Sequence, residues 1–143
     1  MTWIDSATSG VVLARSNDGG ETWTGGDQPA FTPANGAIES AVAVRPDGTV
    51  AVFYYAFTPD TTLPNDTIIT PYVAVSKDGV SGWSAVPIAP PFDLTKMNGG
   101  SGDGPWVVGP YQDIAAFQDG FGTVVTLGDG HGEEHVWFVK VGL

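Results

Sequence analysis

The stretch Ser16-Asn17-Asp18-Gly19-Gly20-Glu21-Thr22-Trp23 decides the fold prediction for this chain. Side chains such as those of Ser16 and Asp18 hydrogen-bond backbone amides two residues further along, which favours a tight turn. Gly20 can adopt a positive φ where the chain turns back, and Trp23 can bury a large ring beneath the turn. The stretch therefore predicts the end of a strand and a tight turn that its tryptophan pins to a sheet.

The same pattern recurs 60 residues later, as Ser76-Lys77-Asp78-Gly79-Val80-Ser81-Gly82-Trp83. Serine, aspartate and tryptophan return at the same spacing, whereas Val80 stands where the first copy has Gly20. The pattern resembles the Asp-box, also called the BNR repeat, which is the hairpin signature of sialidase-like β-propellers. In that family the box is structural and usually lies away from the active site, so the resemblance implies a fold more strongly than a function.

The composition fits one domain of short strands joined by tight turns. The chain has 143 residues, 42% of them apolar, with 20 glycines and 11 prolines, and a core of ordinary size is expected. Its formal net charge of −11 opposes binding to nucleic acid and to anionic lipid. The chain has no cysteine, no apolar run near the length of a membrane span, and no signal-peptide pattern at its first residues.

The apolar segments predict about ten short strands and no helix. Two Asp-Gly pairs, at Asp47-Gly48 and at Asp119-Gly120, predict hairpin turns, and residues 90–110 read as a long loop rich in glycine. The strands are expected at residues 2–4, 10–15, 29–32, 41–45, 49–57, 68–75, 84–88, 114–117, 122–127 and 136–141.

These strands repeat as a unit, because the hairpin at 41–50 matches the one at 114–120. By resemblance to a six-bladed sialidase-like propeller, the chain is an all-β fragment of about two and a half four-stranded blades, similar to the C-terminal half. Residues 1–32 form a partial blade, 37–89 a full blade and 111–143 a second partial blade. Open blade edges invite pairing, so we expect self-association or a missing N-terminal propeller half.

The resemblance to sialidases implies a set of catalytic residues, of which this chain offers one. Those enzymes use three arginines to hold a carboxylate, a Tyr–Glu nucleophile pair and an aspartate as acid and base. Tyr111 stands at the place of the tyrosine, although Gln112 departs from the usual serine. The only arginines are Arg15, beside the first box, and Arg45, in a predicted hairpin turn, and two such arginines cannot form a converging carboxylate clamp.

Other segments of the chain resemble functional sites but also have simpler interpretations. His131-Gly132-Glu133-Glu134-His135 spells a zinc-peptidase pattern, but that chemistry needs a helix, so a solvated hairpin loop without metal is expected. Among the tryptophans, Trp23 and Trp83 are assigned to the cores of their boxes. Trp106 lies in the long loop and is the candidate for contact with a sugar ring. No cofactor is expected.

Two functions follow as hypotheses from the resemblance. The first is a non-catalytic sialidase-like Asp-box module for binding or scaffolding, related to carbohydrate and located outside the cell or at its surface. The alternative is part of an exo-acting, sialidase-type glycoside hydrolase whose missing half carries the arginines and the acid/base. The lack of an arginine in residues 65–75, where the family has its third, favours the first hypothesis.

Overall fold

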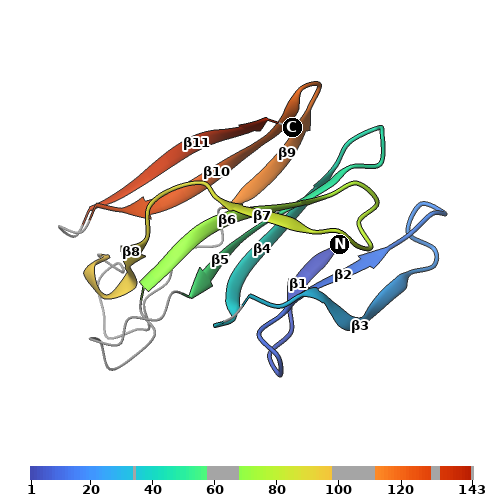
Figure 1. Ribbon diagram of the computed structural model, residues 1–143, viewed down its shortest axis with the longest axis horizontal. Coiled ribbons are helices and arrows are strands. Elements are labelled where there is room, and N and C mark those ends of the chain that lie inside the picture. The colour runs from blue at the N-terminus through green and yellow to red at the C-terminus, as the bar shows by residue number, and fades with distance from the viewer. Residues whose placement is uncertain (34, 58–67, 98–111, 130–132, 143) are drawn as a thin grey trace.

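The computed structural model describes residues 1–33, 35–57, 68–97, 112–129 and 133–142, with only the backbone at 27–29. These residues form three antiparallel sheets, none of them closed into a barrel, which lie side by side (Figure 1). The all-β prediction is confirmed. In this described part the one helical element is a three-residue 3-10 turn, and no helix could cross a membrane.

Sheet 1 contains β1 (Thr2–Ile4), β2 (Val11–Arg15) and β3 (Thr24–Phe31) in that order. The first two strands lie where the sequence predicts them, but β3 begins five residues before the predicted strand at 29–32. The strand starts at Thr24-Gly25-Gly26, although glycine weakens strands. Irregularities in the β2–β3 register accommodate these glycines, which have positive φ angles of 82° and 95°.

Sheet 2 contains β4 (Ala37–Val44), β5 (Val50–Phe57), β6 (Ile68–Ser76) and β7 (Ser84–Pro87), and β8 (Phe92–Asp93) pairs with β6 beyond β7. The predicted loop over 90–110 is wrong at its start, where β8 leads into the 3-10 turn η1 (Leu94–Lys96). The physical reason is burial, since Phe92, Leu94 and Met97 all enter the core. Residues 98–110 lie outside the described part of the chain.

Sheet 3 contains β9 (Asp113–Phe117), β10 (Gly120–Gly128) and β11 (Glu134–Gly142). A two-residue turn, Gln118-Asp119, joins β9 to β10, so the predicted hairpin is present but turns one residue before the Asp119-Gly120 pair. Strands β10 and β11 pair without interruption from Gly120↔Gly142 to Gly128↔Glu134. Within the described residues, β11 has no partner on its other side and forms an open edge of the sheet.

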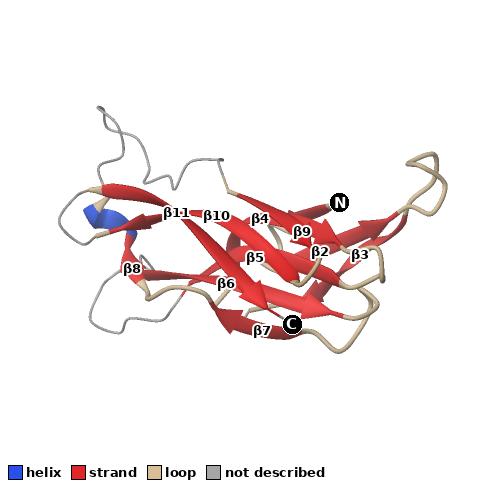
Figure 2. Ribbon diagram, turned by 90° about the horizontal axis from the view of Figure 1, so that it is seen from above, coloured by secondary structure: helices blue, strands red, loops and turns tan. Residues whose placement is uncertain are grey.

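Two hydrophobic cores hold the three sheets together, one on each face of sheet 2. Figure 2 shows the strands of the three sheets from above. Val52, Tyr54 and Ala74 of sheet 2 meet Val11 and Leu13 of sheet 1. On the other face, sheet 2 meets sheet 3 in a core that includes β8 and η1. Strand β4 contacts both β1 and β9, so the first strands of the three sheets lie next to one another.

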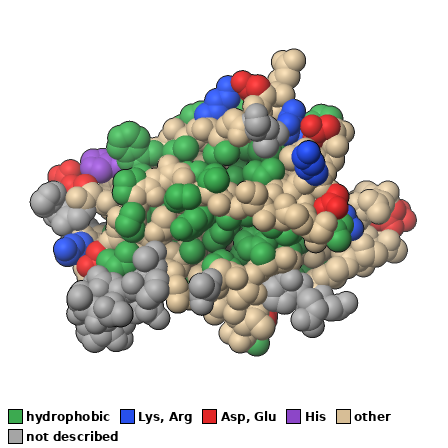
Figure 3. Space-filling view, viewed as in Figure 1, with side chains coloured by type: hydrophobic (Ala, Val, Ile, Leu, Met, Phe, Trp, Pro, Cys, Tyr) green, Lys and Arg blue, Asp and Glu red, His purple; other side chains and the backbone are tan. Residues whose placement is uncertain are grey.

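Hydrophobic side chains also reach the surface. Figure 3 shows them gathered over the central part of the face that Figure 1 views, with charged side chains toward its margins. Large exposed hydrophobic residues are concentrated in β11, where Val136, Trp137 and Phe138 follow one another. A strand with one face in solvent usually alternates apolar and polar residues. These three consecutive residues instead place exposed apolar side chains on both faces of β11.

Candidate functional site

A groove of about 550 Å³ lies between sheets 1 and 2 at the end where β2 runs into the first box. One side of the groove is formed by the first box turn, including Asn17, Gly19, Gly20 and Trp23. The other side comes from β4, β5 and the turn between them. Its lining residues there are Val42, Val44, Gly48 and Val50. The groove thus combines an apolar wall with a wall of turn backbone and one indole ring.

Hydrogen bonds within the first box make this wall a rigid turn. The Ser16 hydroxyl donates to Asp18 Oδ1 at 2.6 Å and accepts from the Gly20 amide at 2.7 Å. Asp18 Oδ1 also accepts from the Thr22 amide at 2.9 Å. Gly20 takes a φ of 98°, the left-handed conformation expected at this position. The turn residues therefore hold the groove wall through their own side chains.

Trp23 contacts its own turn but is not buried, so the prediction that its ring is buried is wrong. Its side chain lines the groove, and the residue is 48% exposed. The indole Nε1–H donates to the Gly20 carbonyl oxygen at 3.1 Å, which holds the ring against its own turn. The polar end of the indole is thereby satisfied inside the turn, and much of the ring remains accessible in the groove.

The second box forms a similar turn despite its departure from the pattern. The Ser76 hydroxyl accepts from the Gly79 amide at 3.0 Å, and Asp78 Oδ1 accepts from the Val80 amide at 2.8 Å. The left-handed conformations fall on Gly79 and Gly82, so Val80 itself carries no backbone strain. Trp83 is half-buried, and it packs against the core between sheets 1 and 2.

Both box carboxylates are held in the ionised form. Hydrogen bonds from the Ser16 hydroxyl, then from the Thr22 hydroxyl and amide, lower the pKa of Asp18 well below its usual value. The amides of Ser81 and Val80, then the Ser76 hydroxyl, do the same for the pKa of Asp78. Neither carboxyl group can act as a proton donor near neutral pH.

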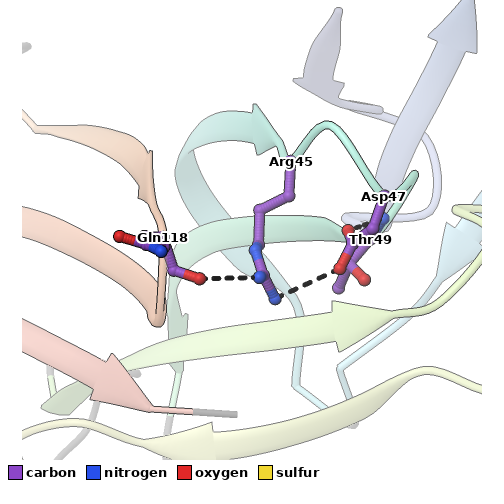
Figure 4. Close-up of polar contacts among 4 residues, drawn as sticks. All are labelled: Arg45, Asp47, Thr49 and Gln118. Carbon is purple, nitrogen blue, oxygen red and sulfur yellow. Dashed lines mark hydrogen bonds and ion pairs between the residues drawn. The ribbon is translucent and has the colours of Figure 1, made fainter.

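The two arginines of the chain link neighbouring sheets. Arg15 Nη1 donates to the Asp78 carbonyl oxygen at 2.9 Å, which joins the end of sheet 1 to the second box of sheet 2. Arg45 Nη2 donates to the Gln118 carbonyl oxygen at 2.9 Å, and its Nη1 lies 3.4 Å from Asp47 Oδ2 (Figure 4). The guanidinium groups belong to different sheet junctions and do not converge on one ligand position.

Tyr111 and Trp106, the predicted catalytic and sugar-contact residues, lie outside the described residues. The structure does place Gln112, the neighbour of Tyr111, beside a buried tyrosine that the sequence analysis did not single out. Gln112 Nε2 donates to the Tyr55 hydroxyl oxygen at 3.4 Å, and that hydroxyl donates to the Thr126 carbonyl oxygen at 2.8 Å. Burial raises the pKa of Tyr55 to about 12, so this phenol stays neutral at ordinary pH.

Three potential metal ligands meet at the connection between β10 and β11. Ligand atoms of Asp129, Glu133 and His135 lie within 4.8 Å of one another, and all three residues are exposed. The Glu133 amide donates to Asp129 Oδ1 at 3.1 Å, so the aspartate also organises the turn. Exposed acidic groups commonly lie this close without an ion, and the expectation of no metal stays a prediction.

Comparison with protein-family models and with curated proteins found no match to this chain.

Proposed function

We propose that the chain is a non-catalytic, sialidase-like Asp-box propeller module that binds carbohydrate in the groove beside Trp23. The observation that carries this proposal is the exposed indole ring, which lines the groove while its Nε1–H is already bonded to Gly20. A sugar ring has an apolar C–H face and a polar rim. A concave site that offers one aromatic face, an apolar wall and a few backbone polar groups suits such a ligand.

The polar groups around the groove support binding without hydrolysis. Glycoside hydrolysis requires a carboxyl group with a raised pKa to protonate the leaving oxygen. Asp18 and Asp78 have lowered pKa values instead, because several hydrogen bonds favour their ionised forms. Arg15, which also lines the groove, uses Nη1 to hold a carbonyl oxygen of the neighbouring sheet.

The propeller arrangement belongs to the same proposal. Three antiparallel sheets lie side by side, and the box pattern follows the second strand of sheet 1 and the third strand of sheet 2. Among the described strands, sheet 1 then has no counterpart of β4 and sheet 3 has no counterpart of β7. This is the arrangement expected of one full and two partial blades. A location outside the cell or at its surface is proposed with it.

Titration with sugars tests the proposal. We expect sialic acid, galactose or N-acetylglucosamine, as free sugars or in short oligosaccharides, to shift the backbone amide NMR signals of Gly19 and Gly20. Trp23→Ala should abolish these shifts. Trp137→Ala removes an equally exposed indole from β11 and serves as the matched control.

Unchanged shifts in Trp23→Ala, or equal loss in both variants, would contradict the binding site. Turnover of a chromogenic sialoside by the chain would contradict the non-catalytic part of the proposal.

A further inference from the structure

A second pocket, of about 180 Å³, lies between sheets 2 and 3 at the end where β10 stops and β11 begins. One wall is the segment Pro90-Pro91-Phe92, which leads from β7 into β8. The other wall belongs to sheet 3, and its lining residues are Leu127, Gly128, Asp129, His135 and Trp137. This pocket is separate from the groove beside Trp23, which lies between sheets 1 and 2.

Strand pairing explains why the indole of Trp137 belongs to this pocket. Trp137 pairs with Val125, which is fully buried in the core between sheets 2 and 3. Directly paired side chains lie on the same face of a sheet, and His135, two residues along β11, lies on that face as well. Trp137 is nevertheless 54% exposed, since β11 is the edge strand of sheet 3 among the described residues. Its ring therefore forms a wall of the pocket.

The two walls of the pocket are held at a fixed distance where they meet at Gly128. An added Cβ at Gly128 would lie 3.3 Å from Phe92 Cδ2 and 3.1 Å from Met97 Cγ. Phe92 and Met97 are both buried in the core between sheets 2 and 3. The packing of the two sheets therefore forms the pocket in advance, as is usual for sites that bind small molecules.

Three side chains with acceptor atoms gather at this pocket. Ligand atoms of Asp129, Glu133 and His135 lie within 4.8 Å of one another, and Asp129 and His135 line the pocket. His135 Nε2 lies 3.8 Å from Glu133 Oε2. The described lining residues include no lysine or arginine, and the whole chain carries a formal charge of −11. The local groups and the net charge both favour a positively charged ligand.

We propose that this pocket binds an alkylammonium ion, which is a primary ammonium group on an apolar stem. The ammonium group donates hydrogen bonds to the carboxylates of Asp129 and Glu133 and is attracted by the face of the Trp137 ring. The stem packs against Pro90 and Pro91, as the apolar part of a lysine side chain covers hydrophobic surface.

The shape of the pocket favours this ligand over others. A metal ion would use the acceptor atoms alone and leave the proline and indole walls uncovered. A quaternary ammonium has no N–H to donate to the carboxylates. The volume is also below the roughly 300–1,000 Å³ of sites for drug-sized ligands, so the pocket suits a small amine or a single lysine side chain.

Titration with n-butylammonium chloride, followed by NMR, tests the proposal. The backbone amide signals of Gly128 and Trp137 should shift and saturate in the millimolar range, as expected of a ligand with so few atoms. The neutral analogue n-butanol has the same stem and should bind at least about tenfold more weakly, because it lacks the charge. The methylamide of Nα-acetyl-lysine distinguishes the source of the ammonium group. A response to it places a lysine side chain in the pocket, and a response to n-butylammonium alone assigns a free amine.

A matched pair of variants locates the charge that the ligand meets. Glu133→Gln should raise the dissociation constant of n-butylammonium about threefold, because an exposed ion pair contributes modestly. Glu134→Gln is the control, since it removes the same charge from the neighbouring residue. Strand alternation places Glu134 on the face opposite to His135, so this variant should bind like the wild type. Far-UV circular dichroism checks that both variants fold.

Four results would overturn the proposal. These are unchanged signals of Gly128 and Trp137, equal binding of n-butanol and n-butylammonium, equal affinity of the Glu133→Gln and Glu134→Gln variants, and a response of these signals to calcium or zinc ions but not to n-butylammonium. None of them affects the groove beside Trp23, whose test reads the signals of Gly19 and Gly20.

Discussion

Replacing Tyr55 by phenylalanine tests how sheets 2 and 3 are held together. Tyr55 is fully buried, and its hydroxyl donates to the Thr126 carbonyl oxygen of sheet 3 at 2.8 Å. The phenylalanine ring can keep the edge-to-face contact with Phe53, at a centroid distance of 5.0 Å, so no large cavity forms. The loss is two hydrogen bonds, the one that Tyr55 donates to Thr126 across the sheet junction and the longer one, at 3.4 Å, that it accepts from Gln112. Such a loss costs about 1–2 kcal/mol of unfolding free energy and should lower Tm by about 3–6 °C.

Denaturant unfolding followed by circular dichroism measures this change, with Tyr54→Phe as the matched control. Tyr54 is the next residue on β5, is also buried, and points to the opposite core. The structure assigns no hydrogen bond from the Tyr54 hydroxyl to any described residue. Tyr54→Phe should therefore change the unfolding free energy by less than about 0.5 kcal/mol. Equal effects of the two substitutions, or no loss in Tyr55→Phe, would refute the role given to the Tyr55–Thr126 bond.

The same residue predicts a dependence of stability on alkaline pH. Burial raises the pKa of Tyr55 from 10.0 to about 12, so the folded state holds its proton more tightly than the unfolded state. The stability that this difference contributes is fully present below pH 10 and is lost as pH rises toward 12. Tyr55→Phe should therefore lose less stability over that interval than the wild type. Equal slopes of unfolding free energy against pH would contradict this reading.

Further predictions concern the two boxes and sheet 1. Asp18 and Asp78 have lowered pKa values, so the stability they contribute is present above pH 3.8 and is lost as pH falls below it. A double variant, Asp18→Asn with Asp78→Asn, should therefore show a flatter dependence of unfolding free energy on pH in that acid range. Gly25→Ala should destabilise by at least about 2 kcal/mol, because its φ is 82° and the new Cβ would lie 2.9 Å from a carbonyl oxygen of β2. Gly82→Ala, with a φ of 61° and open space around it, should cost only about 1 kcal/mol in the same melts. Trp23→Ala should cost about 1–2 kcal/mol, roughly half the value for a buried tryptophan, because the ring is half exposed; a loss above 3 kcal/mol would show that the ring is buried after all.

Most of the strand order followed from the sequence, because apolar segments and turn residues act over short distances. The turn at Asp18 lies where its residue types predict it, and the hairpin between β9 and β10 turns one residue before the predicted Asp119-Gly120 pair. The errors came where packing overrode local preference. Strand β3 begins among glycines that would weaken an isolated strand, and Phe92, Leu94 and Met97 form ordered structure where glycine and proline content indicated a loop.

The candidate site was less predictable than the fold. The sequence predicted Trp23 as a core residue. Its exposure in a groove could not be predicted, because it depends on where sheet 2 lies relative to the first box. The closeness of Asp129 to Glu133 and His135 depends on the pairing of β10 with β11, although the zinc-like motif had marked that segment. Tyr55 carried no signal in the sequence, because nothing local distinguishes it from the other tyrosines of the chain.

The sequence by itself determined the two box turns, because their hydrogen bonds join residues only two to four positions apart. It also indicated the strands, because their apolar segments and the turns between them are local features. Only the tertiary structure decided which groups the two arginine side chains bind. Arg15 reaches a carbonyl oxygen 63 residues away and Arg45 one that is 73 residues away, and neither partner can be inferred from the neighbouring residues. The stacking of whole sheets sets these contacts, and it likewise buries Val73 between sheets 2 and 3 while Phe138 stays exposed.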